Sequence, residues 1–166
     1  MKNPAYHNIG DHAETIQIEF DPAKISYKEM LGMFFSQHNA CATPWSRQYM
    51  SAIFYHSAEQ KKLEQEAREK QGTNARGKVA TEISECKDFW PAEDYHQKYV
   101  LRNSDLMREF KAMYPKESDF VKSTAAARVN AYLSGAGKLE DLKADLPNLG
   151  LSDEAQKRLL REFNRR

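Results

Sequence analysis

The chain has 166 residues, and its 25 Lys and Arg against 24 Asp and Glu give a formal net charge of +1. This balance gives the protein no general electrostatic reason to bind nucleic acid or an acidic membrane surface. A hydrophobic fraction of 40% supports a packed core and excludes a wholly disordered chain. No apolar run approaches the ~20 residues that span a bilayer.

Cysteine usage and the first residues indicate the compartment. Cys41 and Cys86 are far apart, and neither lies in a Cys-x-x-Cys pair. We therefore expect neither a disulfide framework nor a cysteine-based zinc site, and we predict no bound metal. The first residues lack the apolar stretch of a secretory signal, so we expect a cytoplasmic protein.

The first predicted element is a half-buried strand over His12–Phe20. Glu14, Ile16, Ile18 and Phe20 alternate with polar residues, which is the period of a strand with one buried face. The Glu14 carboxyl shares this apolar face, and burial there would raise its pKa and make it a proton donor near neutral pH. The alternative is a partly solvated carboxylate with a structural role.

A helix and a strand alternate through the next part of the chain. Ser26 and Glu29 form a capping-box pattern before a helix that is predicted to run to about His38. The remaining predicted elements of this part are a strand over Tyr49–Tyr55, a charged helix from Ser57 to about Gly72 and a strand over Lys78–Ile83.

The character of the sequence changes after Ser104, where helical patterns replace strands. The predicted helices are Asp105–Met113, Thr124–Leu133, Leu139–Leu146 and Asp153–Asn164. The sequence therefore predicts an α/β core over residues 1–101, with an antiparallel or mixed sheet, and a helical C-terminal extension over residues 102–166.

Two patterns suggest chemistry besides Glu14. Cys41 lies in a loop with Trp45 and Arg47, where a nearby cation could lower the pKa of a nucleophilic thiol; a small, inert apolar filler is the alternative. His12-Ala13-Glu14 matches the first half of the zinc deaminase signature. The companion Pro-Cys-x-x-Cys is nowhere in the chain, so we do not predict a deaminase.

A series of short strings, in this order, resembles the peptide methionine sulfoxide reductase A family. The resemblance covers roughly residues 3–101, and the collinear order of the strings makes it specific. The strings are Asn3-Pro4-Ala5-Tyr6, His12-Ala13-Glu14, Phe20-Asp21-Pro22, Ile25-Ser26-Tyr27, Phe34-Phe35 with His38, Gln48-Tyr49-Met50-Ser51-Ala52-Ile53, Thr81-Glu82-Ile83 and Ala92-Glu93-Asp94-Tyr95-His96-Gln97.

The resemblance implies an α+β plait with a ferredoxin-like core, and reduction of methionine-S-sulfoxide in proteins and as the free amino acid. A nucleophilic cysteine attacks the sulfoxide sulfur, and another thiol, often with thioredoxin behind it, resets the enzyme without a bound cofactor. The glutamate and two tyrosines that surround the sulfoxide oxygen in the family fall on Glu14, Tyr6 and Tyr49.

The departures from the family pattern affect the nucleophile. The family places it in a Gly-Cys-Phe-Trp-Gly motif upstream of the Asn-Pro-x-Tyr string, and this chain contains no such motif. We therefore expect a domain that lacks its N-terminal part, with an oxygen-binding half-site and little or no reductase activity of its own. The alternative is a non-catalytic module of this fold that binds peptides or a protein partner.

Overall fold

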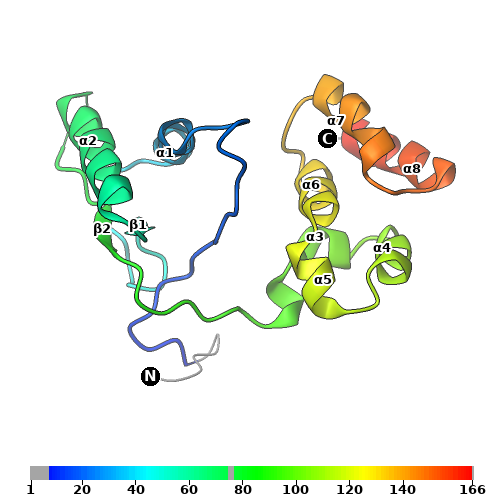
Figure 1. The fold of residues 1–166 in the computed structure, drawn as a ribbon, viewed down its shortest axis with the longest axis horizontal. Helices are drawn as coiled ribbons and strands as arrows, with labels where there is room; N and C mark the ends of the chain where they lie inside the picture. Colours follow the sequence, from blue (N-terminus) through cyan, green and yellow to red (C-terminus); the bar gives the residue numbers. More distant parts are fainter. Residues whose placement is uncertain (1–7, 75–76, 166) are drawn as a thin grey trace. The chain divides into compact units, whose positions relative to one another are not determined.

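The computed structural model describes residues 8–74 and 77–165. The chain forms two compact units, Met1–Pro91 and Ala92–Arg166, and each is described by itself (Figure 1). The first unit contains both strands of the described residues, and the second is helical. The predicted α/β class is therefore confirmed.

The first unit is built on a β–α–β arrangement. Strand β1 (Ala52–Tyr55) leads into helix α2 (Ala58–Asn74), which returns the chain to strand β2 (Glu82–Glu85). The two strands pair in parallel, with Ile53 opposite Ile83, because the α2 crossover brings the chain back in the same direction. Helix α2 lies against both strands (Figure 1).

Helix α1 (Tyr27–Ser36) packs on α2, and its capping box is confirmed. The Ser26 side chain accepts a hydrogen bond from the Glu29 backbone N–H at 3.2 Å, and the Glu29 carboxylate accepts one from the Ser26 backbone N–H at 2.8 Å. Leu31 and Phe35 lie one turn apart and are the two buried apolar residues among the described residues of this unit.

The predicted strand over His12–Phe20 is wrong. These residues form no strand, and Ile16 and Ile18 are 81% and 53% exposed. An alternating pattern becomes a strand only where a neighbouring edge supplies backbone partners. Among the described residues, the backbone of residues 13–20 receives one such partner, because the Glu14 N–H donates to the Gln48 carbonyl.

The predicted sheet also differs in detail. The first strand covers Ala52–Tyr55 and so begins later than predicted, and the second covers Glu82–Glu85 and so both begins and ends later. Their pairing is parallel rather than antiparallel or mixed. The parallel pairing follows from the helix between the two strands, whereas antiparallel pairing needs only a short turn.

The second unit packs short helices around one apolar core (Figure 1). Its central helix is α6, which contacts α3 and α8. Phe110, Phe120 and Val129 are among the residues that this core buries completely. The elements are η1 (Asp94–His96), α3 (Tyr99–Arg102), α4 (Met107–Met113), α5 (Glu117–Lys122), α6 (Thr124–Leu133), α7 (Leu139–Asp145), η2 (Leu146–Asn148) and α8 (Asp153–Asn164).

A side chain from α6 caps α3. The Asn130 side-chain carbonyl accepts hydrogen bonds from the backbone N–H groups of Val100 and Leu101, at 3.0 and 3.1 Å. These amides belong to the first turn of α3 and have no partner within the helix. A residue 30 positions away in sequence therefore fixes where this four-residue helix begins.

A glycine allows a close approach in the same unit. Gly150 has a φ of +71°, and a Cβ atom at this position would lie 2.8 Å from the Sδ atom of Met113. Only glycine combines this backbone conformation with this contact at no steric cost. The Met113 sulfur is therefore packed directly over the Gly150 backbone.

In the described part of the chain, no helix combines the length and the apolar character needed to cross a membrane.

Candidate functional site

A tight turn carries Tyr49, one of the two predicted oxygen-binding residues that the structure describes. The Met50 N–H donates to the Arg47 carbonyl at 3.3 Å, which closes the turn over Gln48 and Tyr49. The Tyr49 ring stacks on the Trp45 ring, with 4.8 Å between the ring centroids. The turn thus presents an aromatic pair that is exposed to solvent.

Two hydrogen bonds attach Glu14 to this turn. The Glu14 N–H donates to the Gln48 carbonyl at 2.9 Å, and the Gln48 side-chain amide donates to the Glu14 Oε1 at 2.7 Å. The structure therefore brings Glu14 against the residue that precedes Tyr49. Gln48 makes this link, and in the sequence Gln48 appears only as one residue of a matching string, without a role of its own.

Glu14 is exposed, so its predicted burial on an apolar strand face is wrong. The prediction depended on a strand that does not form, and the isoleucines expected to enclose the carboxyl face solvent. The arrangement matches the alternative of a partly solvated carboxylate. One carboxylate oxygen accepts a hydrogen bond from Gln48, and the residue as a whole is exposed.

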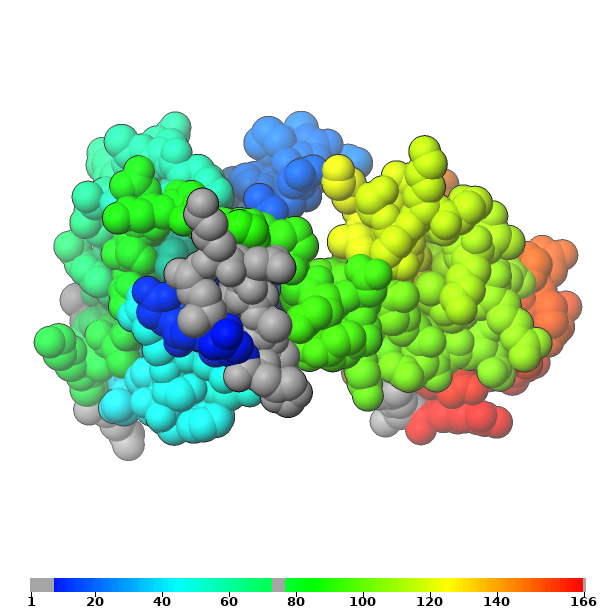
Figure 2. Space-filling model, turned by 90° about the horizontal axis from the view of Figure 1, so that it is seen from below, coloured from blue at the N-terminus to red at the C-terminus, as the bar shows by residue number. Residues whose placement is uncertain are grey.

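Arg47 joins the turn to two other segments. Its Nε donates to the Asp11 carbonyl at 2.7 Å, and its Nη1 lies 3.5 Å from a carboxylate oxygen of Glu82 in β2. In Figure 2, the segment that follows residue 7, in dark blue, lies against the cyan loop that contains Arg47. Arg47 therefore holds the segment that leads to Glu14 beside the turn that carries Tyr49.

A chain of polar contacts holds the other end of the turn. The His38 Nδ1 lies 2.9 Å from the Phe34 carbonyl, and the His38 Nε2 lies 2.9 Å from the Ser51 hydroxyl. The Ser51 hydroxyl is in turn 2.9 Å from the hydroxyl of Thr81, which is 2% exposed. These residues appear in the matching strings of the sequence without an assigned role, and their polar character next to predicted strands was the available signal.

Two further candidates are Tyr6 and Cys41. Tyr6 is outside the described residues, so its predicted place at the site stays a prediction. Cys41 is half-buried, and among the described residues its N–H donates to the Asn39 side chain and its thiol lies 3.4 Å from the Gly77 carbonyl. These contacts are those of a small packed side chain, which favours the filler role.

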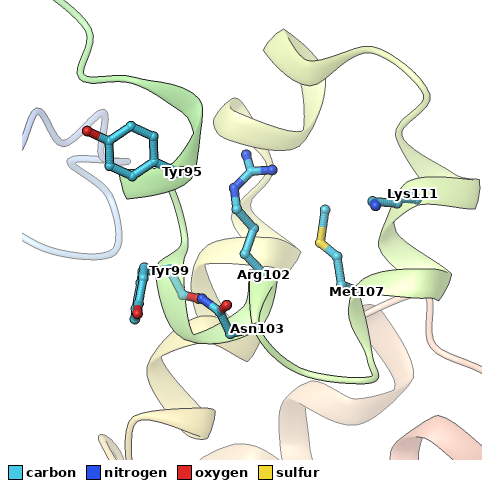
Figure 3. Close-up of a pocket in the computed structure, with 6 residues that line it drawn as sticks. All are labelled: Tyr95, Tyr99, Arg102, Asn103, Met107 and Lys111. Atoms are coloured by element: carbon cyan, nitrogen blue, oxygen red, sulfur yellow. The ribbon is translucent and has the colours of Figure 1, made fainter.

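The second unit contains a cavity of about 270 Å³ that is lined by none of the predicted site residues that the structure describes. Figure 3 shows Arg102 between Tyr99 on one side and Met107 on the other. The Arg102 Nε donates to the Gln97 carbonyl at 2.9 Å, and its guanidinium forms an ion pair with Glu117 and lies 4.9 Å from the centre of the Phe120 ring, so this side chain stabilises the fold. The lining residues are Tyr95, Tyr99, Arg102, Asn103, Met107 and Lys111.

Over residues 8–74 and 77–165, no group of three or more His, Cys, Asp and Glu side chains is arranged to hold a metal ion. The chemistry available at the turn is therefore that of hydrogen-bond donors, a carboxylate and two aromatic rings. Such groups can bind a small polar acceptor beside an apolar substituent.

Comparison with known proteins gives a consistent result. A family model described as peptide methionine sulfoxide reductase matches residues 1–129. A peptide methionine sulfoxide reductase of Drosophila melanogaster is 38% identical over 151 residues, which cover 90% of this chain and 61% of that protein. Peptide methionine sulfoxide reductase A5 of Oryza sativa subsp. japonica is 34% identical over 135 residues, which cover 78% of this chain and 53% of that protein.

A bacterial relative is similar over a comparable length. The peptide methionine sulfoxide reductase MsrA of Leptospira borgpetersenii is 37% identical over 131 residues, which cover 74% of each protein. The family match extends beyond residue 101, where the resemblance of the sequence strings ends, into the second unit. The chain spans between about half and two thirds of the length of the Drosophila and rice proteins.

Proposed function

The chain belongs to the peptide methionine sulfoxide reductase family, and from that membership we propose that its first unit binds the methionine-S-sulfoxide group through Glu14, Tyr6 and Tyr49. The proposed ligands are methionine-S-sulfoxide in oxidised proteins and the free amino acid. The observation that carries the proposal is the family match over residues 1–129. The hydrogen bonds that hold Glu14 beside the Tyr49 turn support it.

The proposed chemistry divides into binding and attack. The protonated Glu14 carboxyl and the tyrosine hydroxyls donate hydrogen bonds to the sulfoxide oxygen, and Glu14 supplies the proton that this oxygen needs when it leaves sulfur. A cysteine thiol attacks that sulfur, so methionine is released and the cysteine is oxidised to a sulfenic acid. A second thiol, such as that of thioredoxin, condenses with the sulfenic acid to a disulfide and releases water. No bound cofactor takes part.

The sequence of this chain lacks the motif that carries the nucleophilic cysteine of the family. Its cysteines are Cys41 and Cys86, and neither stands in a Gly-Cys-Phe-Trp-Gly motif. Loss of a nucleophile costs many orders of magnitude even when the rest of a catalytic site remains. We therefore propose that the chain alone is inactive or nearly so. We also propose that its β–α–β unit is part of a ferredoxin-like plait and that the protein is cytoplasmic.

The reductase proposal is tested by reduction of dabsyl-methionine-S-sulfoxide with dithiothreitol, using the intact chain and Cys41→Ser. The expected result is no turnover above the uncatalysed rate for either protein. Robust turnover by the intact chain would contradict the proposed inactivity. Loss of that turnover in Cys41→Ser would identify Cys41 as the nucleophile.

The binding proposal needs its own experiment. N-acetyl-methionine-S-sulfoxide is titrated into the intact chain, with the R epimer as the control ligand, and binding is measured by calorimetry. Glu14→Gln and Tyr49→Phe should weaken binding of the S epimer, whereas Glu19→Gln, on the same exposed segment, should leave it unchanged. Equal affinity of Glu14→Gln and Glu19→Gln would show that Glu14 is not part of the site.

The second candidate function is a non-catalytic module that binds native or oxidised methionine peptides, or a protein partner. The exposure of Ile16 and Ile18 favours it. Among the described residues, the backbone of residues 15–20 forms no hydrogen bond to another segment, and such a segment with exposed apolar side chains can receive an added strand. A native methionine peptide that binds as tightly as its S-sulfoxide form would support this function over the first.

A further inference from the structure

The contacts around His38 determine which ring nitrogen carries its proton. The Nδ1 lies 2.9 Å from the Phe34 carbonyl oxygen, and a carbonyl oxygen only accepts hydrogen bonds. The Nδ1 must therefore carry the hydrogen. In the neutral imidazole the Nε2 is then an acceptor, which reverses the tautomer that predominates in free histidine side chains.

The same reasoning orders the two hydroxyl groups that follow. The Nε2 of neutral His38 accepts from the Ser51 hydroxyl at 2.9 Å, so the single Ser51 proton is used in that bond. The Ser51 oxygen must then accept from the Thr81 hydroxyl, also at 2.9 Å. Each of the two contacts therefore contains one proton: the Thr81 hydroxyl donates to Ser51, and the Ser51 hydroxyl donates to His38. We name these three side chains the His38 relay.

The His38 ring is held in place although the residue is exposed. Its ring lies 4.6 Å from that of Phe34 in an edge arrangement and 6.3 Å from that of the buried Phe35 in a stacked arrangement. The helix that carries both phenylalanines ends at Ser36, so the end of α1 determines the position of the imidazole. The other end of the relay, Thr81, is buried beside β2.

Ser51 connects the relay to the turn that carries Tyr49. Its backbone carbonyl accepts from the Glu82 N–H at 2.9 Å, and its side chain is fixed by His38 and Thr81. Tyr49 is two residues earlier, inside the turn that Arg47 and Met50 close. Ser51 is therefore fixed through both backbone and side chain where the turn joins β1.

We infer that the His38 relay, with His38 in its Nδ1–H tautomer, is a positioning device that sets the orientation of Tyr49 for the sulfoxide oxygen. His38 and Ser51 are positioning residues in this assignment, because they act through the turn and touch no reacting atom. The inference rests on the proposed function for the role of Tyr49. Its structural part stands on the contacts alone.

The first experiment determines the tautomer of the His38 imidazole. Long-range ¹H–¹⁵N spectra of the intact chain distinguish Nδ1–H from Nε2–H histidines, and the His38 signals are identified by their loss in His38→Gln. The expected result is the Nδ1–H pattern for His38 at a pH where the ring is neutral. An Nε2–H pattern would overturn the inference.

The second experiment monitors the conformation of the turn through the NMR signal of the Trp45 indole N–H, because the Trp45 ring stacks on Tyr49. The chain has two tryptophans, so the Trp90 signal serves as an internal reference. Ser51→Ala should shift the Trp45 signal, and Ser51→Thr, which keeps the hydroxyl, should restore it. The matched control is Ser36→Ala, whose hydroxyl bonds within its own helix to the Met33 carbonyl. A Trp45 signal that responds equally to Ser51→Ala and Ser36→Ala would overturn the inference.

The third experiment separates this inference from the proposed function. N-acetyl-methionine-S-sulfoxide should bind Ser51→Ala at least about fivefold more weakly than the intact chain, which corresponds to the loss of one hydrogen bond, and Ser51→Thr should recover the affinity. If the intact chain binds and Ser51→Ala binds equally well, the inference fails while the proposed function stands. If the intact chain does not bind, the proposed function fails, and the tautomer and the Trp45 signal still decide whether the relay fixes the turn.

Discussion

Glu64 is a carboxyl group that the fold removes from water. The residue is 0% exposed, one of its oxygens accepts a 2.5 Å hydrogen bond from the Tyr27 hydroxyl, and the other has no hydrogen-bond partner among the described residues. Burial raises the Glu64 pKa above its ordinary value, although the Tyr27 bond and the nearby His56 act in the opposite direction. The pKa of Tyr27 is raised as well, by burial and by the same bond. The contact joins α1 to α2.

This pKa shift makes the stability of the first unit depend on pH. A carboxyl whose pKa is raised by folding contributes its full stability below its unfolded pKa, near 4.5, and loses it as the pH rises through the folded value. We therefore expect the free energy of unfolding to fall as the pH rises from 4.5, and Glu64→Gln to reduce this dependence. Urea unfolding followed by tryptophan fluorescence at a series of pH values measures it, because Trp45 and Trp90 both lie in this unit.

The matched control for Glu64 lies on the same helix. Glu69 is exposed on α2, so Glu69→Gln removes a carboxyl that folding does not take from water. The control should retain the pH dependence of the intact chain. An identical pH dependence for Glu64→Gln and the intact chain would mean that Glu64 is not the responsible group.

At the scale of elements, local signals predicted the helices whose ends are fixed by their own residues. Ser26, Ser123 and Ser152 cap α1, α6 and α8 with side-chain oxygens, and each is visible in the sequence. The short helices α3 and α5 were not predicted, because four and six residues are too few to show the repeating apolar pattern of a helix. Helix α3 depends on Asn130, a partner that no local pattern can reveal.

The candidate site shows the same limit. The resemblance placed Glu14 and Tyr49 together, and the structure links them through Gln48. The strand prediction for the Glu14 segment failed because strand formation depends on a neighbouring edge, which alternation does not encode. Arg47 and the His38 relay were missed for a similar reason, since their partners lie tens of residues away in sequence.

Removal of the Asn130 cap should destabilise the second unit. Asn130→Ala leaves two backbone amides of α3 without their acceptor, at an expected cost of about 1–2 kcal/mol. Thermal unfolding followed by far-ultraviolet circular dichroism measures the change. Asn148→Ala, an exposed asparagine in η2, is the matched control, and Asn130→Asp should recover part of the stability. Equal stability of the two alanine variants would exclude the cap.

The backbone amides of the segment that was predicted as a strand and does not form one should exchange rapidly. The backbone of residues 15–20 has no hydrogen-bonded partner strand in the described part of the chain, whereas β1 and β2 pair with each other. Hydrogen exchange followed by NMR should show fast exchange at Ile16 and Ile18 and slow exchange within β1 and β2. Protection at Ile16 and Ile18 comparable to that of the strands would contradict the structure.

At the scale of the whole molecule, the chain divides after Pro91 into two units, while the family match continues across that point to residue 129. The family pattern is therefore not confined to the α/β unit. The apolar core that buries most residues completely belongs to the helical unit, and this part of the sequence was predicted only as a C-terminal extension.

The segment before the division should be the first site of proteolysis. Residues 87–91 are exposed and form no helix or strand, and exposed backbone of this kind is the preferred substrate of proteases. Brief chymotrypsin treatment of the intact chain should cut after Phe89 and yield two fragments that mass spectrometry identifies, and Phe89→Ala should slow this cut. A first cut within a helix of either unit would contradict the division.

The contact between Met113 and Gly150 makes the helical unit vulnerable to oxidation of its own methionine. A sulfoxide adds a polar oxygen to the thioether, and the Met113 sulfur has no space on the side of Gly150, where even a Cβ atom would be 2.8 Å away. Peroxide treatment should therefore lower the melting temperature of this unit, and Met113→Leu should prevent the loss, whereas Met33→Leu, at a residue 58% exposed on α1, should not. With Met113 oxidised, the chain would contain within its own fold the lesion that its relatives are named for reducing.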